Sequence, residues 1–159
     1  MGFYNYLIHT FFKQEIIYVD CFKQLIEITP NIGKEKSIGL DTEFTWKNTY
    51  YPSLNLIQIS AKNKIYIIDC IEITDLKPLA PIFESKEIKK IFHSMKGDLS
   101  ALRTKFNNKF ANIRDTQIAE FMLSRNPNQQ ISYKDLVKKY FFVDLPKSET
   151  NSDWTRRPL

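Results

Sequence analysis

Apolar and polar residues alternate along the first half of the chain in the pattern of β-strands. In the segment SIGLDTEF, residues 37–44, the apolar side chains fall on one face of a strand, whereas Asp41 and Glu43 fall on the other. Two further apolar runs, at residues 54–60 and 64–70, are joined by a connection short enough for a hairpin. We therefore expect these three strands to be antiparallel neighbours.

Helical spacing of apolar residues appears between and after these strands. The expected elements are a strand at 15–19, a helix capped by Asp20 and stopped by Pro30, a short or kinked helix around Pro81, a strand at 88–95, a helix at 97–106, a strand ending at the helix cap Asp115, and a helix capped by Ser132. Strands that first pair as hairpins and then alternate with helices predict an α/β or α+β domain, a mixed sheet with flanking helices.

Composition supports a single folded domain. The chain has 159 residues, of which 43% are apolar, which is enough for a core and too apolar for a disordered chain. The formal net charge of +5 suits a polyanionic partner. With only 4 glycines, the chain has no glycine-rich loop for binding phosphates.

The cysteines and the N-terminal residues bear on location. Cys21 and Cys70 form no CxxC pair and the chain has only 2 histidines, so a structural zinc site is not expected. Cys70 follows an apolar run and is predicted to be a buried, reduced thiol, which fits a cytoplasmic location. The apolar N-terminus lacks the basic start and the cleavage site of a signal peptide and is too short to span a bilayer, so no membrane association is expected.

Three acidic residues are candidates for metal chemistry. Asp41 and Glu43 repel each other on one strand face, and a divalent cation between them would remove that cost; the alternative is an acidic strand end running into water. Asp98 follows the strand at 88–95 and opens a helix, where it is either a third ligand or an ordinary helix N-cap or first-turn acid favoured by the helix dipole. The three acids converge only if the strands that lead to Asp41 and Asp98 are neighbours.

Five segments in order carry a resemblance to a known family. They are LDTEF, TYYPSLNLIQIS, FHSMKGDLSAL, RDTQIAEFML and LPKSETNSDWTRRPL. Together they resemble ribonuclease D, one of the 3′–5′ exonucleases of the ribonuclease H-like fold whose four acids spell D-E-D-D. The resemblance covers residues 16–159, which we interpret as the exonuclease domain, and leaves residues 1–15 as an N-terminal extension of unknown role.

The resemblance implies roles for the three acids. Asp41 and Glu43 would ligate one metal ion, Asp41 would bridge to a second, and Asp98 would hold the second ion largely through water. Carboxylate oxygens suit Mg²⁺ or Mn²⁺, and the two ions would assist in-line attack of water on the last phosphodiester of an RNA. The implied substrate is the single-stranded 3′ end of RNA, such as a tRNA precursor. No protein partner is evident, and a monomer is expected.

The match also has a departure. The family's third motif is a Tyr-x-x-x-Asp on a helix shortly after W-x-x-R-P-L, and the sequence given stops at Leu159, before that point. We therefore expect a ribonuclease H-like sheet that lacks its C-terminal helix, with weak activity, marginal stability and apolar surface uncovered beside Asp41 and Glu43. The acids that remain in the tail are interpreted as solvated loop residues: Asp144, Glu149 and Asp153.

Other contacts with substrate are weaker candidates. Phe44 and His93 flank the acids and are candidates to stack on or bond to the terminal nucleotide, the alternatives being core packing and a core histidine with satisfied hydrogen bonds. Candidates for phosphate and base contacts in the tail, otherwise a solvated charge run, are Lys147, Trp154, Arg156 and Arg157. Two alternative functions stay open: a non-catalytic nucleic-acid-binding remnant of a split gene, and a proofreading-type exonuclease acting on DNA.

Overall fold

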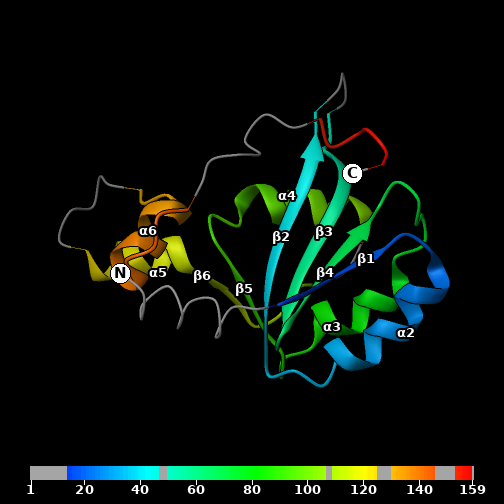
Figure 1. Ribbon diagram of the computed structural model, residues 1–159, viewed down its shortest axis with the longest axis horizontal. Coiled ribbons are helices and arrows are strands. Elements are labelled where there is room, and N and C mark those ends of the chain that lie inside the picture. The colour runs from blue at the N-terminus through cyan, green and yellow to red at the C-terminus, as the bar shows by residue number, and fades with distance from the viewer. Residues whose placement is uncertain (1–13, 47–49, 107–108, 125–129, 146–152, 159) are drawn as a thin grey trace.

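The computed structural model describes residues 14–46, 50–106, 109–124, 130–145 and 153–158. Within these residues the chain forms one six-stranded sheet with the order β1-β4-β3-β2-β5-β6 (Figure 1). Its strands are β1 (Glu15–Val19), β2 (Ser37–Thr45), β3 (Ser53–Ala61), β4 (Lys64–Asp69), β5 (Lys89–Phe92) and β6 (Ile113–Asp115).

The pairing of these strands is mixed, as predicted. Strands β2, β3 and β4 form an antiparallel meander, β5 pairs parallel to β2, and β6 pairs parallel to β5. This confirms the three antiparallel neighbours and the parallel strands that follow. Strand β1 adds to the other edge by pairing parallel to β4.

Helices flank the sheet, and two details of the first helix differ from our expectations. The helices are α2 (Phe22–Ile32), α3 (Ala80–Glu84) after the 3-10 turn η1 (Lys77–Leu79), α4 (Lys96–Lys105), α5 (Thr116–Leu123) and α6 (Tyr133–Phe141). The predicted cap at Asp20 is wrong, because Cys21 occupies the N-cap position and no side chain caps this end. The predicted stop at Pro30 is also wrong. The last turn continues past Pro30 because the N–H of Gly33 donates to the carbonyl of Thr29 at 2.9 Å.

One face of the sheet is buried beneath α2, α3 and α4. The register aligns Leu40, Ile59 and Tyr66 in one cross-strand row of this face, and all three belong to the buried core. Edge-to-face packing of Phe83 on Phe106, with centroids 5.1 Å apart, joins α3 to the end of α4 beneath the same face. The core therefore lies on the side of the sheet opposite Asp41 and Glu43.

The other face is more open. Its rows include Gly39–Ser60–Ile65–Ile16 and Asp41–Gln58–Ile67–Tyr18. Ile16 is 65% exposed and Tyr18 38% exposed. Apolar side chains are thus exposed on the face that carries Asp41, on the β1 side.

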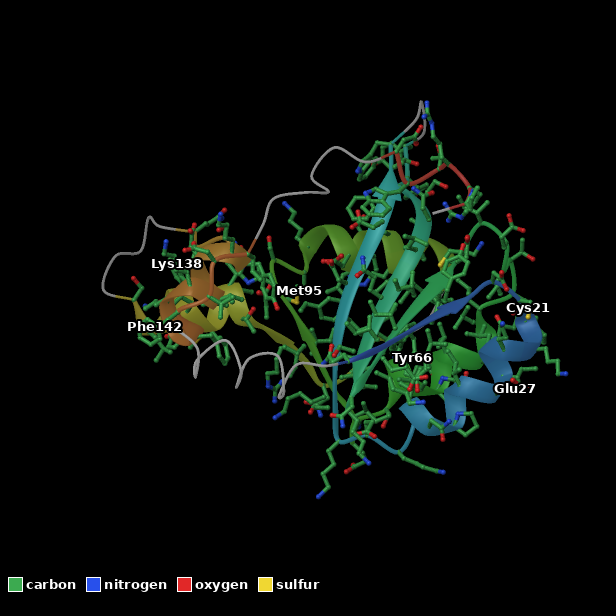
Figure 2. All side chains as sticks on the ribbon, in the orientation of Figure 1. Cys21, Glu27, Tyr66, Met95, Lys138 and Phe142 are labelled. Carbon is green, nitrogen blue, oxygen red and sulfur yellow. The ribbon has the colours of Figure 1, made fainter. Side chains whose placement is uncertain are left out.

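Helices α5 and α6 form a pair beside the sheet rather than beneath it (Figure 1). Figure 2 shows Lys138 and Phe142 on this pair, away from the sheet. The buried carboxylate of Glu120 on α5 binds Lys139 and accepts a hydrogen bond from the hydroxyl of Tyr140 at 2.6 Å, both from the α6 side. No helix in the described part of the chain is long and apolar enough to cross a membrane.

Candidate active site

The acids on β2 lie where this strand loses its outer neighbour. Strand β5 pairs with β2 only as far as Gly39, so the edge of β2 beyond Gly39 is left to other groups. Asp41 and Glu43 then alternate with the buried Thr42, as predicted, and face the open side of the sheet. Asp41 is exposed and Glu43 is half-buried.

Asp98 fills this free edge from the first turn of α4. Its Oδ1 accepts hydrogen bonds from the N–H of Thr42 at 3.1 Å and from the Oγ1 of Thr42 at 2.6 Å. Asp98 is not the helix cap, because Met95 occupies that position, and its side chain is only 7% exposed. The parallel pairing of β5 with β2 therefore delivers Asp98 to the strand that carries the other two acids, as the sequence argument required.

All three carboxylates have a raised pKa, and at Glu43 and Asp98 a neighbouring carboxylate adds to the effect of burial. Burial is the main cause that raises the pKa of Glu43, to about 7, and the charges of Asp41 and Asp98 raise it further. Desolvation by packed neighbours raises the pKa of Asp41, although hydrogen bonding to Thr42 and the nearby His93 oppose the shift. Burial also raises the pKa of Asp98, aided by the charge of Asp41 and opposed by the bonds from Thr42. A site whose acids all resist ionisation is one that a cation would stabilise.

The chemistry of these donors fits a hard divalent cation, with one limit. Carboxylate oxygens are the ligands that Mg²⁺ and Mn²⁺ prefer, and the mutual repulsion supplies affinity. Among the described residues, however, no three His, Cys, Asp or Glu side chains are grouped closely enough to hold one metal ion together. A metal ion held by these acids, with water and substrate completing its coordination, therefore stays a prediction.

Phe44 is packed rather than free. Its ring lies against Gly97 at the start of α4, where a Cβ would come within 2.9 Å of Cζ, and it contacts Trp46 edge-to-face at 6.4 Å between centroids. Phe44 is half-buried and Trp46 is 57% exposed. Phe44 is therefore partly packed against the core, as the alternative proposed. Its role as a contact to the terminal nucleotide stays a prediction.

His93 is held by hydrogen bonds from both sides of its ring. Nδ1 lies 2.9 Å from Thr116 Oγ1, and Nε2 lies 3.1 Å from the carbonyl oxygen of Ile131. His93 also lines a pocket of about 400 Å³ together with Asp41 and Tyr133. With both nitrogens engaged, His93 fixes the start of α6 beside Asp41, and it meets a nucleotide only through its ring face or by giving up a bond.

The last described segment approaches the open face of the sheet at the row of Glu43. Arg157 forms a bidentate ion pair with Asp69, which is fully buried at the end of β4 and also binds the hydroxyl of Tyr18. Arg157 is thus committed to an internal partner rather than to phosphate. Asp69 was not among the candidate residues predicted from the sequence; its place at the end of the apolar run of β4 is the signal that could have indicated a buried charge, but the sequence does not identify its partner.

The other tail candidates have mixed outcomes. Trp154 is half-buried, and its carbonyl accepts a hydrogen bond from Arg157 at 3.0 Å. Arg156 is exposed and pairs with Asp153 at 3.5 Å. Asp144 pairs with Lys138 at 3.0 Å, and both side chains are exposed. Lys147 and Glu149 lie outside the described residues.

The free cysteines agree with expectation. Cys70 is buried and Cys21 is exposed, and neither takes part in a disulfide in the described chain. Burial is the main cause that raises the pKa of the Cys70 thiol, to about 12, so it is unreactive.

This fold and this set of acids define a class of protein. The family model for the 3′–5′ exonuclease matches residues 16–159, and the chain belongs to that family.

Within this family, the chain is similar in sequence and structure to ribonuclease D and to RRP6. The chain is 36% identical, over 92% of its length, to ribonuclease D of Desulfotalea psychrophila, and it spans 39% of that protein. It superposes on the crystal structure of Escherichia coli RNase D with a TM-score of 0.85 and 32% identity, covering 92% of this chain and 38% of that one. It also superposes on the catalytic core of RRP6 from Trypanosoma brucei with a TM-score of 0.82 and 28% identity, covering 92% and 40%. The chain thus spans well under half the length of each.

Proposed function

We propose that residues 16–159 form a metal-dependent 3′–5′ exoribonuclease domain that trims the single-stranded 3′ end of structured-RNA precursors, of the tRNA type. The observation that supports the proposal is the pair of hydrogen bonds that Asp98 accepts from Thr42, the residue between Asp41 and Glu43, in a member of the 3′–5′ exonuclease family. RNA is favoured because the E. coli neighbour is described as an exoribonuclease involved in structured RNA processing.

Each acid has a proposed role. Two Mg²⁺ or Mn²⁺ ions, when bound, would activate a water molecule and stabilise the charge on the leaving 3′ oxygen. Asp41 and Glu43 supply oxygens from the open face of β2. Thr42 fixes Oδ1 of Asp98, so Oδ2 is the oxygen we assign to the ligand set. Phe44, His93, Trp154 and Lys147 are proposed contacts to the substrate.

Substitution of Asp41 tests this function. Asp41→Asn keeps the size of the side chain and removes its charge, so we expect trimming of a 5′-labelled RNA in Mn²⁺ to fall to background while the melting temperature does not decrease. Asp20→Asn is the matched control, since Asp20 is exposed beside β1 at the far edge of the sheet. Trimming by Asp41→Asn at the unaltered rate would show that the two-metal assignment is wrong.

The same assay separates the alternatives. A 3′-phosphate block on the RNA should stop the reaction, because the enzyme we propose starts at a free 3′ end. Faster degradation of the DNA of the same sequence would favour the proofreading-type exonuclease, and absence of any metal-dependent trimming would favour the non-catalytic remnant. A cytoplasmic location and a monomeric state belong to the same proposal, and light scattering measures the second.

A further inference from the structure

A second groove runs along the outer side of α4, next to the acids but not formed by them. Its volume is about 790 Å³. It is lined by the turn between β5 and α4, by the outer face of α4, by the first turn of α5 and by Tyr51 just before β3. Met95, labelled in Figure 2, is one of the lining residues from the turn between β5 and α4.

Helix α4 connects the groove to the candidate active site. Asp98 lies on its buried face and binds β2, whereas Lys96, Leu99 and Arg103 line the groove from an adjoining face at helical spacing. Gly97, between Lys96 and Asp98, packs on the ring of Phe44. On α4, only Gly97 separates Lys96, which lines the groove, from Asp98, which binds β2. A bound nucleic-acid strand can therefore reach from the groove to the three acids.

The groove is positively charged. Lys96 and Arg103 are exposed in it, and Asp115 is the one acid among the described residues that line it. The carboxylate of Asp115 accepts four hydrogen bonds from backbone N–H groups, those of Ser94, Met95, Gln117 and Ile118. These bonds stabilise its charge locally, which leaves the two cations to act on a ligand.

Apolar and aromatic surface lies between and beyond these charges. Leu99 lies between Lys96 and Arg103 along α4, and the groove is also lined by Ile118, which is 48% exposed, and by Tyr51, which is 64% exposed. Cations alternating with flat apolar surface are the arrangement by which proteins hold single strands, with phosphates on the charges and bases on the rings.

We propose that this groove binds the nucleotides that precede the 3′-terminal nucleotide of a single-stranded RNA. The proposal rests on the proposed function, since it extends the same substrate away from Asp98. Lys96 and Arg103 stand two turns apart on α4, roughly 10 Å, which is too far for one phosphate and suits two phosphates of one strand. Tyr51 stacks on a base beyond Arg103.

Binding of an oligonucleotide tests the groove directly. The probe is a 5′-fluorescein octauridylate with the 159-residue chain in EDTA, measured by anisotropy across a salt series. Lys96→Ala/Arg103→Ala should weaken binding at least tenfold and reduce the slope of log affinity against log salt by about 1.4, or about 0.7 for each phosphate that the variant no longer neutralises. The control pair Lys34→Ala/Lys86→Ala removes the same charge from exposed sites before β2 and β5, at the opposite end of these strands.

Tyr51 gives an independent arm. Tyr51→Ala should weaken binding about fivefold or more because a base can no longer stack on the ring. Tyr51→Phe keeps the ring and should bind as the unaltered chain does.

A dinucleotide separates this proposal from the proposed function. A dinucleotide is too short to reach from the acids along the groove, so the Lys96/Arg103 variant should hydrolyse UpU in Mn²⁺ at the unaltered rate. The groove assignment is wrong, and the proposed function stands, if UpU is hydrolysed and either of two results is found. One is that the groove pair and the control pair of substitutions weaken octauridylate binding equally. The other is that the unaltered chain does not bind octauridylate at low salt. Equal affinity for poly-L-glutamate would assign the groove to acidic peptides and overturn the RNA assignment. Loss of metal-dependent hydrolysis of both UpU and RNA would overturn the proposed function itself.

Discussion

At the scale of single residues, Glu43 shows how the binding of a proton and of a cation are coupled at this site. Burial and then the charges of Asp41 and Asp98 raise the pKa of Glu43 from 4.5 to about 7. Near neutral pH a proton therefore competes with a cation for this carboxylate. The pKa values of Asp41 and Asp98 are raised as well, so protons compete with a cation at all three carboxylates.

This competition predicts how stability depends on pH when divalent ions are chelated. Because the folded protein holds a proton on Glu43 more tightly than the unfolded chain does, its contribution to stability is fully present below pH 4.5 and is lost as the pH rises through about 7. We expect a loss on the order of 1–2 kcal/mol, discounted because Glu43 is half exposed. Melting temperatures in EDTA from pH 5 to 8 should fall for the unaltered chain and stay flatter for Glu43→Gln.

Glu72→Gln is the control for this series. Glu72 is exposed in the turn after β4, so the variant should keep the slope of the unaltered chain. Parallel curves for Glu43→Gln and the unaltered chain would contradict the assignment of the slope to Glu43.

Some of these residues could be predicted from the sequence, and others depend on contacts that it does not encode locally. Asp41 and Glu43 point to the same side because side chains alternate along a strand. That Asp98 lies near them was expected because a short strand leads directly into the helix that carries it. That Asp98 bonds to Thr42 depends on how far β5 pairs along β2, which no local pattern records. The partner of Arg157 is likewise set by tertiary packing.

At the scale of elements, Asp115 joins two helices. It caps α5 by accepting from Gln117 at 2.8 Å and Ile118 at 3.4 Å, and it also accepts from Ser94 at 3.0 Å and Met95 at 2.9 Å in the turn before α4. Ser94 takes a left-handed conformation, with φ of 61°, in this turn. The cap predicted from sequence is confirmed, and it also orients the helix that carries Asp98.

Removing this carboxylate should cost more than removing an ordinary cap. We expect Asp115→Ala to lower the free energy of unfolding by about 2 kcal/mol or more, because caps alone contribute about 1 kcal/mol and the turn before α4 also loses its acceptor. Urea denaturation measures the change. The control Asp75→Ala removes an exposed acid that accepts from the N–H of Lys77 and should cost less; an equal cost would show that the bonds to Ser94 and Met95 contribute nothing.

The elements themselves were mostly predictable, and the errors cluster at one helix. Alternation and helical spacing located the strands of the meander and the helices after β5 because binary pattern sets these elements. At α2 the pattern was overridden. Asp20 lies one position before the cap, and Pro30 removes one donor from the last turn, yet the helix continues to Ile32. Pro81, which looked too deep in its helix, lies in the first turn of α3, where a backbone N–H has no acceptor within the helix and its absence in proline is tolerated.

At the scale of the whole molecule, the ion pair of Arg157 and Asp69 attaches residues 153–158 to the sheet. Burial alone would raise the pKa of Asp69, but hydrogen bonds from Arg157, Tyr18 and two backbone N–H groups outweigh it and hold the pKa at about 2. The carbonyl of Asn55, the extra residue of β3 where its register with β2 shifts, lies 3.5 Å from the guanidinium. The expected exposure of apolar surface beside Asp41 and Glu43 stays a prediction, although Ile16 and Tyr18 on this face are exposed.

A double-mutant cycle should expose this coupling. Arg157→Met leaves a buried carboxylate without its cation and should cost about 3–5 kcal/mol, whereas Asp69→Asn/Arg157→Met should cost less than the two single changes added together. The stability that ionised Asp69 contributes is present above pH 3.8 and is lost as the pH falls through about 2. Urea unfolding at neutral pH measures the cycle, with the exposed Arg156→Met as the control. Additive single and double variants would contradict a coupled pair.

The same ion pair imposes an order on how the molecule is made. Asp69 and Arg157 lie 88 residues apart along the chain. During synthesis the carboxylate at the end of β4 therefore leaves the ribosome well before its cation, while the β3–β4 hairpin can already pair. Closing so long a loop costs entropy that local pairing does not, so docking of residues 153–158 should follow assembly of the meander. Until then we expect Asp69 to remain hydrated, and the sheet face beside Glu43 to close only after the meander has formed.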